Sequence, residues 1–169
     1  IFTDSSGVGQ TLAALLMARG ETCFIISPSK DQVSEQGQFW IDPNRPEQMH
    51  QFIENVLGPN QPLCKGALHL WSLNETFSDE MTSSSLETSQ VLGVSSVLSL
   101  LQALSNVKQT VPPRLWLVTK GAQSIGTESS LPAIAQTPLW GLGKTCATEH
   151  ADIWGGMVDL DPQATEDET

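Results

Sequence analysis

The 169-residue sequence contains no tyrosine, so no phenol is available as a proton donor in any reaction. Lysine and arginine number 8 against 19 aspartates and glutamates, a formal net charge of −11. Phosphate contacts need clustered cations, so this balance argues against nucleic acid and anionic membranes as partners. No run approaches the roughly 20 apolar residues of a membrane span, and the first residues do not resemble a signal peptide. We therefore expect a cytoplasmic protein.

Metal and disulfide chemistry also have little basis in the sequence. Cys23, Cys64 and Cys146 are odd in number and lie far apart, without Cys-x-x-Cys spacing. This pattern predicts buried thiols in a reducing compartment, and neither a zinc site nor a disulfide framework. The acidic residues near the C-terminus lack the central glycine of a calcium loop, so we expect them to be solvated. They are Asp159, Asp161, Glu166, Asp167 and Glu168.

The apolar pattern predicts one α/β domain with a doubly wound parallel sheet and helices on both faces. Hydrophobic residues make up 39% of the chain, enough for a single core. The expected strands are residues 1–3, 22–27, 38–41, 67–73, 115–119 and 156–160. The expected helices start near Gly9, Pro46, Leu86 and Pro138, and residues 76–90 begin as a loop. We assign residues 1–162 to the domain and 163–169 to an acidic linker.

The glycine turn after the first expected strand is the candidate dinucleotide site, because such a turn lets a pyrophosphate approach a helix N-terminus. Only Gly7 and Gly9 are present. Leu12 stands where the usual pattern needs a third glycine, and Thr3 stands where the reductase variant needs one. No acidic residue follows the second strand to bind a ribose, although Lys30 could meet a 2′-phosphate. The pattern favours a structural turn without bound cofactor.

The candidate acid lies in the last helix. Reductases of the short-chain type use a tyrosine and a lysine with three residues between them, on one helix face. Lys144 has this spacing, but Trp140 occupies the tyrosine position. An indole N–H donates a hydrogen bond and does not deliver a proton at neutral pH. We therefore expect no catalytic residue.

A hydrolase is a weak alternative. Residues 122–126 (AQSIG) resemble a nucleophile elbow, but Ser124 comes several residues after its strand rather than on the turn. Glu149 and His150 are sequence neighbours, so their side chains diverge on a helix. His69 is expected in the core, His50 on an exposed helix and His150 at a helix C-terminus.

Five blocks in order along nearly the whole chain carry a resemblance to a known family. The chain resembles the structural subdomain of a modular type I polyketide synthase ketoreductase. The blocks are DSSGVGQ (4–10), LHLWSLN (68–74), PRLWLVTKGAQ (113–123), TPLWGLGK (137–144) and EHADIWGGMVDLDP (149–162).

The resemblance implies a truncated Rossmann-like, short-chain-reductase-like fold. In that family the ketoreductase region consists of two reductase-like halves. The N-terminal half binds no cofactor and packs on the catalytic half, which uses NADPH to reduce the β-keto group of a carrier-bound chain. This chain is then the non-catalytic half, and its partners are the catalytic half and other domains of the same synthase.

The expected partner interface lies around the last helix, where Gly141 and Gly143 would permit close helix approach and Trp140 and Trp154 would anchor the contact. Three alternatives remain open. The first is a pseudo-ketoreductase scaffold beside a methyltransferase or enoylreductase. The second is a standalone NADPH-dependent short-chain reductase, and the third is an interaction module outside polyketide synthesis.

Overall fold

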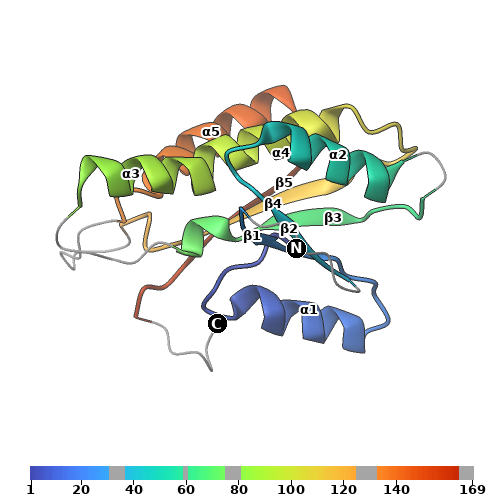
Figure 1. Cartoon of the computed structure of the whole chain (residues 1–169), viewed down its shortest axis with the longest axis horizontal. Helices are drawn as coiled ribbons and strands as arrows, with labels where there is room; N and C mark the ends of the chain where they lie inside the picture. The colour runs from blue at the N-terminus through green and yellow to red at the C-terminus, as the bar shows by residue number, and fades with distance from the viewer. Residues whose placement is uncertain (31–36, 59–60, 75–80, 125–132, 164–169) are drawn as a thin grey trace.

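The computed structural model describes residues 1–30, 37–58, 61–74, 81–124 and 133–163. Five named strands run parallel (Figure 1). They are β1 (Ile25–Pro28), β2 (Gln38–Ile41), β3 (Gly66–His69), β4 (Arg114–Lys120) and β5 (Trp154–Leu160).

The first residues of the chain join these strands into one sheet. Phe2 bridges to Ile26 of β1 on one side and to His69 of β3 on the other. Phe2 N donates to Leu68 O at 2.8 Å, and Thr3 N donates to Ile26 O at 2.8 Å. The order across the sheet is therefore β2, β1, residues 1–3, β3, β4 and β5. In chain order this is 3-2-1-4-5-6, the order of the dinucleotide-binding fold, which confirms the predicted Rossmann-like class.

Helices cover the two faces unequally. Figure 1 shows α1 (Val8–Ala18) alone on one side of the sheet, with the other helices on the opposite side. Those are α2 (Pro46–Leu57), α3 (Ser83–Gln90), α4 (Ser96–Ser105) and α5 (Thr137–Glu149). Their starts follow local chemistry. Pro46 opens α2 and Pro138 lies in the first turn of α5, whereas Thr82 and Ser85 form a capping box at α3.

Two sequence predictions were wrong in this region. The strand expected over 67–73 ends at His69, because a 3₁₀ turn (Trp71–Asn74) leads the chain off the sheet. Ser72 Oγ donates to Val118 O at 2.6 Å, and Trp71 Nε1 donates to Ile26 O at 3.2 Å, so side chains hold this turn. The helix expected from Leu86 starts three residues earlier, at Ser83, since Thr82 and Ser85 cap it. The loop expected before it falls mostly in residues 75–80, outside the described part, and stays a prediction.

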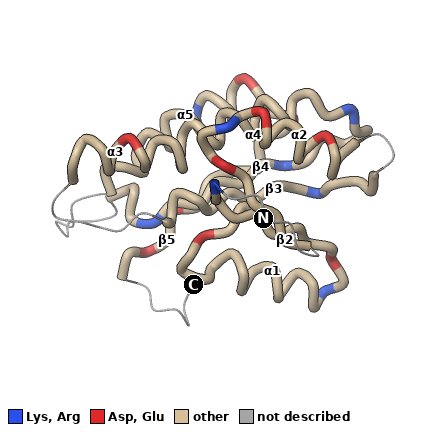
Figure 2. The backbone as a smooth tube through the Cα atoms, in the orientation of Figure 1, with Lys and Arg blue, Asp and Glu red and all other residues tan. Residues whose placement is uncertain are grey.

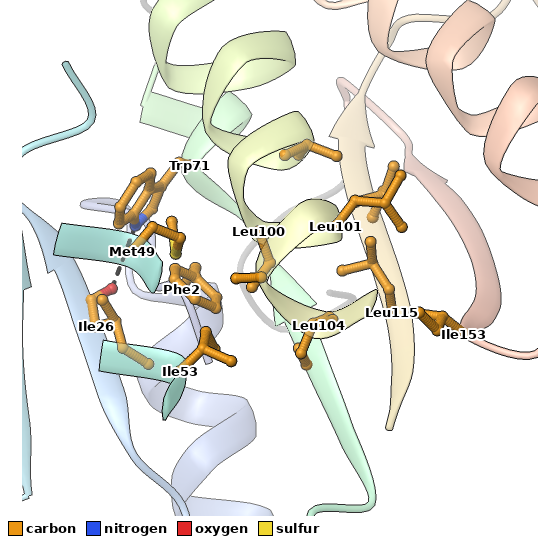
Figure 3. Packing of buried hydrophobic residues seen from close by; sticks show 14 of the residues in the cluster. Phe2, Ile26, Met49, Ile53, Trp71, Leu100, Leu101, Leu104, Leu115 and Ile153 are labelled. Atoms are coloured by element: carbon orange, nitrogen blue, oxygen red, sulfur yellow. Dashed lines mark hydrogen bonds between the residues drawn. The ribbon is translucent and has the colours of Figure 1, made fainter. Parts of the chain in front are cut away.

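The core lies between the sheet and the layer of α2 and α4 (Figure 3). Leu100, Leu115 and Leu117 are fully buried. Phe2 meets Trp71 edge-on at 5.3 Å between ring centroids. The core therefore depends on the first residues of the chain as much as on the long strands. The predicted linker falls mostly in residues 164–169, outside the described part, and stays a prediction.

Candidate functional site

Ligands of open α/β sheets bind beyond the carboxyl ends of the strands. Two places at that edge bear on function. One is the turn from the first strand into α1, where a dinucleotide's pyrophosphate would lie. The other is the space between the end of β4 and the start of α5, where a reductase's acid would lie.

Asp4 fills the first place. The residue is 2% exposed. Its carboxylate accepts hydrogen bonds from Gly9 N at 2.7 Å, Ser6 N at 3.0 Å and Val8 N at 3.3 Å, and also from Ser6 Oγ. The N–H groups of Val8 and Gly9 belong to the first turn of α1 and are among the orphan donors that bind anions at helix N-termini. The protein thus supplies its own anion where a phosphate would be held.

Both glycines of this turn have structural reasons. Gly7 precedes α1 with a φ of +103°, a conformation that favours glycine. A Cβ on Gly9 would collide with Thr3, whose hydroxyl donates to Gln10 Oε1 at 2.9 Å. The turn is close-packed against its own strand.

A cavity of about 560 Å³ lies beside this turn, at the ends of β1 and β2. Its lining includes Lys30, Asp42, Asn44 and Asn74, together with residues of α3. Hydrogen bonds from the backbone and side-chain amides of Asn44 hold the pKa of Asp42 below its ordinary value. Asn74 Oδ1 already accepts from Ser5 N at 2.6 Å. The hollow is lined by both polar and apolar residues, and the side-chain amide of Asn74 is already used to fix the turn.

The second place is closed by a chain of hydrogen bonds. Trp140 Nε1 donates to Thr119 Oγ1 at 3.0 Å, and Thr119 Oγ1 donates to Asp159 Oδ1 at 2.7 Å. The Asp159 carboxylate also accepts from Ala122 N at 3.0 Å and Gln123 N at 2.8 Å. The network therefore binds α5, β4 and β5 together. Lys144, the partner of a catalytic tyrosine in a reductase, is exposed on α5.

Asp159 had been predicted to be solvated, and this was wrong. It belongs to β5 and is half-buried, because its carboxylate anchors the backbone turn after β4.

The four predicted interface residues have different environments. Gly141 is exposed, and a Cβ there would meet nothing within 4 Å. Gly143 is buried, and a Cβ would collide with Met157 Sδ and lie 3.1 Å from Trp154 Cη2. Close approach at Gly143 is thus made with β5 of the same chain and not with a partner helix, which corrects that part of the hypothesis. Trp140 and Trp154 are half-buried in these internal contacts.

Ser124 and His150 lie at opposite ends of the sheet. Ser124 follows the end of β4, whereas Arg114 at its start donates to Ala151 O at 2.9 Å, next to His150. A seven-residue strand spans about 20 Å. The structure does not bring the two residues together, so the hydrolase interpretation fails.

His69 is completely buried, as expected of a core histidine. Its Nε2 lies 2.9 Å from Ser96 Oγ, its Nδ1 has no hydrogen-bond partner, and burial lowers its pKa to about 3. Of the three free thiols only Cys146 is buried; Cys23 and Cys64 are half-buried, so the prediction of buried thiols holds for one. Burial raises the pKa of Cys146.

Among the described residues, no group of three or more His, Cys, Asp or Glu side chains is placed to hold a metal ion. In the same part of the chain, no helix has the length and apolar character needed to cross a bilayer.

Sequence reasoning missed the roles of Asp4, Thr119 and Asp159. For Asp4 a local signal existed, because a carboxylate three residues before a Gly-x-Gly turn can reach the N–H groups of that turn. For Thr119 no local signal existed, since its partners are 21 and 40 positions away in sequence.

Comparison with known proteins identifies the family. Residues 38–169 match the family described as "Polyketide synthase extender module SpnB, Rossmann fold domain", and the chain belongs to this family. It is an N-terminal structural Rossmann subdomain of a modular polyketide synthase ketoreductase region.

Relatives in sequence are large synthases. The chain is 43% identical over 68 residues to polyketide synthase GfsA of Streptomyces halstedii, which covers 40% of this chain and 1% of that protein. It is 40% identical over 72 residues to the pikromycin polyketide synthase component PikAII of Streptomyces venezuelae. This match covers 43% of this chain and 2% of that protein. The chain thus corresponds to a small fraction of the relatives it matches.

Solved structures agree in fold. A C2-type ketoreductase from a modular polyketide synthase is 25% identical with a TM-score of 0.62, covering 96% of this chain and 30% of that one. A multidomain structure with adenylation and ketoreductase domains from a keto acid-selecting NRPS module has a TM-score of 0.83 at 21% identity. The match covers 98% of this chain and 13% of that one. The latter likeness concerns the fold alone.

Proposed function

We propose that this chain is the non-catalytic half of a ketoreductase region, which docks on and stabilises an NADPH-dependent catalytic half. Its parent module then reduces the β-keto group of a carrier-bound polyketide chain. The partner half supplies both cofactor and acid.

The observation that carries this proposal is that residues of the chain itself fill both the cofactor-binding turn and the position of the catalytic acid that a reductase needs. Asp4 uses the donors that would hold a pyrophosphate. Trp140 and Asp159 satisfy Thr119 where an acid would act. Displacing a buried carboxylate that accepts several hydrogen bonds has a high free-energy cost. A dinucleotide would therefore bind at this turn only weakly.

A titration of the purified chain with NADPH, followed by the fluorescence of the coenzyme, tests the lack of cofactor binding. We expect no saturable binding up to millimolar concentrations. A parallel titration with 2′,5′-ADP probes the hollow beside Lys30 separately, because this fragment has no pyrophosphate to compete with Asp4.

The hollow near Lys30 favours the standalone NADPH reductase as second candidate. Saturable micromolar binding of NADPH, together with turnover of a ketone by the chain alone, would establish that candidate and overturn the proposal.

The outer surface of α3 and α4, with the adjoining part of α5, is the proposed docking surface. Glu87 is the only charged residue between positions 83 and 105, in a chain of net charge −11 (Figure 2). Leu98 of α4 is 43% exposed, and on α5 Gly141 is exposed next to half-buried Trp140. Depletion of charge with an apolar centre is typical of interface cores. This surface therefore fits a permanent protein neighbour.

Mixing the chain with the catalytic half of the same synthase, followed by size-exclusion chromatography, tests docking. Leu98→Glu should weaken the complex at least tenfold, since it buries an unpaired charge. Leu63→Glu is the matched control, because Leu63 is 65% exposed and lies outside the helix layer. Equal complex formation by both variants would contradict the proposed surface.

A pseudo-ketoreductase beside a methyltransferase or enoylreductase would show the same closed sites. The order of domains in the parent synthase and a keto-reduction assay of the whole module distinguish this case. A module that leaves its β-keto group unreduced would assign the chain to such a scaffold.

A further inference from the structure

The sheet face on the α1 side is only partly covered. Figure 1 shows α1 beside β1 and β2, with no helix over β4 and β5 on that side among the described residues. Parallel sheets bury both faces, because helices pack on each side. Part of this sheet therefore lacks its usual cover.

Alternation along β4 shows which residues point to this uncovered side. Leu115 and Leu117 are buried in the core, whereas Arg114 and Trp116 are exposed. Trp116 and Val118 lie opposite Gly156 and Val158 of β5 in the register. Trp116 is 41% exposed and Val158 is 43% exposed. The face is apolar at its centre.

Trp116 is held in place by the two glycines of β5. A Cβ on Gly155 would lie 2.6 Å from Trp116 Nε1, and a Cβ on Gly156 would lie 2.9 Å from Cζ3. Gly156 has a φ of +150°, and the register shifts between Leu115 and Trp116. Glycines weaken a strand unless something must approach closely. Here they let an indole lie against the backbone and still face outward, which is the form of a preorganised interface anchor.

The charges on this face are opposite in sign to the chain as a whole. Arg114 and Lys120 lie at the two ends of β4 on the same side as Trp116. Asp159 is the one acidic residue in β3, β4 and β5, and its carboxylate bonds Thr119 on the opposite, helix-covered side. The uncovered face thus combines an apolar centre with cationic ends.

We infer that this face docks an amphipathic helix whose apolar stripe is flanked by Asp or Glu, supplied by another domain of the same synthase. The inference rests on the proposed function, because it requires a synthase around the chain. A helix matches the way parallel sheets are covered. Acidic flanks complement Arg114 and Lys120, and like charges opposite them would be repelled.

Photo-crosslinking in the intact synthase tests the inference. Val158 is replaced by p-benzoylphenylalanine, the enzyme is irradiated, and crosslinked peptides are identified by mass spectrometry. The expected partner peptide comes from another domain of the same polypeptide, with apolar residues at helical spacing and acidic neighbours. Trp116→Ser should reduce this crosslink at least tenfold, as expected for loss of an aromatic anchor, and Lys120→Glu should also reduce it.

Two further positions make the result specific. The same crosslinker at Leu63 is the control for an exposed apolar position outside the face, and at Leu98 it reports the helix-layer surface. Crosslinks at 98 without any at 158 would overturn this inference and leave the proposed function standing. Crosslinks at 158 to a second copy of this chain, or to a strand added at the edge of β5, would also overturn it. Crosslinks at neither position 98 nor position 158 would overturn both this inference and the proposed function.

Discussion

At the scale of single residues, a carboxylate offers oxygen acceptors much as a phosphate does, and Asp4 uses them on the N–H groups of its own turn. Thr119 is likewise hydrogen-bonded within the chain, because its hydroxyl accepts from Trp140 Nε1 and donates to Asp159. His69 is the exception, because its Nδ1 is buried without a partner. Burial of this ring disfavours its protonated form and lowers its pKa, so the core should be sensitive to acid.

Acid should destabilise the protein through His69. Burial lowers its folded-state pKa to about 3 from the ordinary 6.5, so below pH 6.5 the unfolded chain binds a proton that the folded chain does not. The free energy of unfolding should therefore fall from pH 6.5 towards pH 3, by at most about 1.4 kcal/mol per pH unit from this residue. Urea unfolding measured at several pH values gives this slope.

His69→Gln should flatten the slope while keeping a polar group near Ser96. His150→Gln, at the end of α5, is the control for loss of a half-buried imidazole outside the core. An unchanged slope in His69→Gln would show that other groups cause the acid sensitivity.

At the scale of elements, α5 shows that two glycines in one helix can serve opposite purposes. Gly141 faces open space, whereas Gly143 gives room to Met157 and Trp154 of β5. The sequence PLWGLGK contains both and does not distinguish them. Only the rotation of the helix on the sheet does so.

Alanine substitutions at the two positions should change the free energy of unfolding in opposite directions. Gly141→Ala should stabilise the protein by about 0.5–1 kcal/mol, because glycine is a poor helix former. Gly143→Ala should destabilise it by about 1–3 kcal/mol through overpacking against Met157. Thermal unfolding of the two variants side by side measures the difference. Equal shifts would mean that α5 packs on β5 with a different face.

At the scale of the whole molecule, charge is far from balanced. The net charge is −11, and the described residues form two ion pairs, Arg45 with Asp42 and Lys65 with Glu21. Self-repulsion destabilises a compact chain of this kind.

Sodium chloride should therefore raise the melting temperature. Screening of self-repulsion between 20 mM and 500 mM salt should add on the order of 1 kcal/mol, or about 2–4 °C for a domain of this size. Scanning calorimetry at neutral pH measures the shift. Near the pI of about 4.4 the shift should shrink, and a salt-independent melting temperature at neutral pH would contradict the argument.

The sequence predicted the class of the sheet because alternating apolar runs and helical periods are local patterns. β2 was predicted with its observed bounds, since Gly37 and Asp42-Pro43 delimit it. The 3₁₀ turn after β3 was missed, because the apolar run continues through Trp71 and only contacts with β1 and β4 end the strand. The lack of a catalytic tyrosine was readable directly from the sequence. The hydrogen bonds that close the place where such a tyrosine would act were not.

By itself the sequence determined the parallel α/β fold, the acidic charge and the absence of a phenolic acid, because each depends on residue type and short-range order. The tertiary structure decided that Asp4 closes the turn, that Trp140, Thr119 and Asp159 meet, and that Trp116 lies outward on two glycines. These contacts mostly join residues tens of positions apart. Their geometry follows from how the helices and strands pack, which no local pattern encodes.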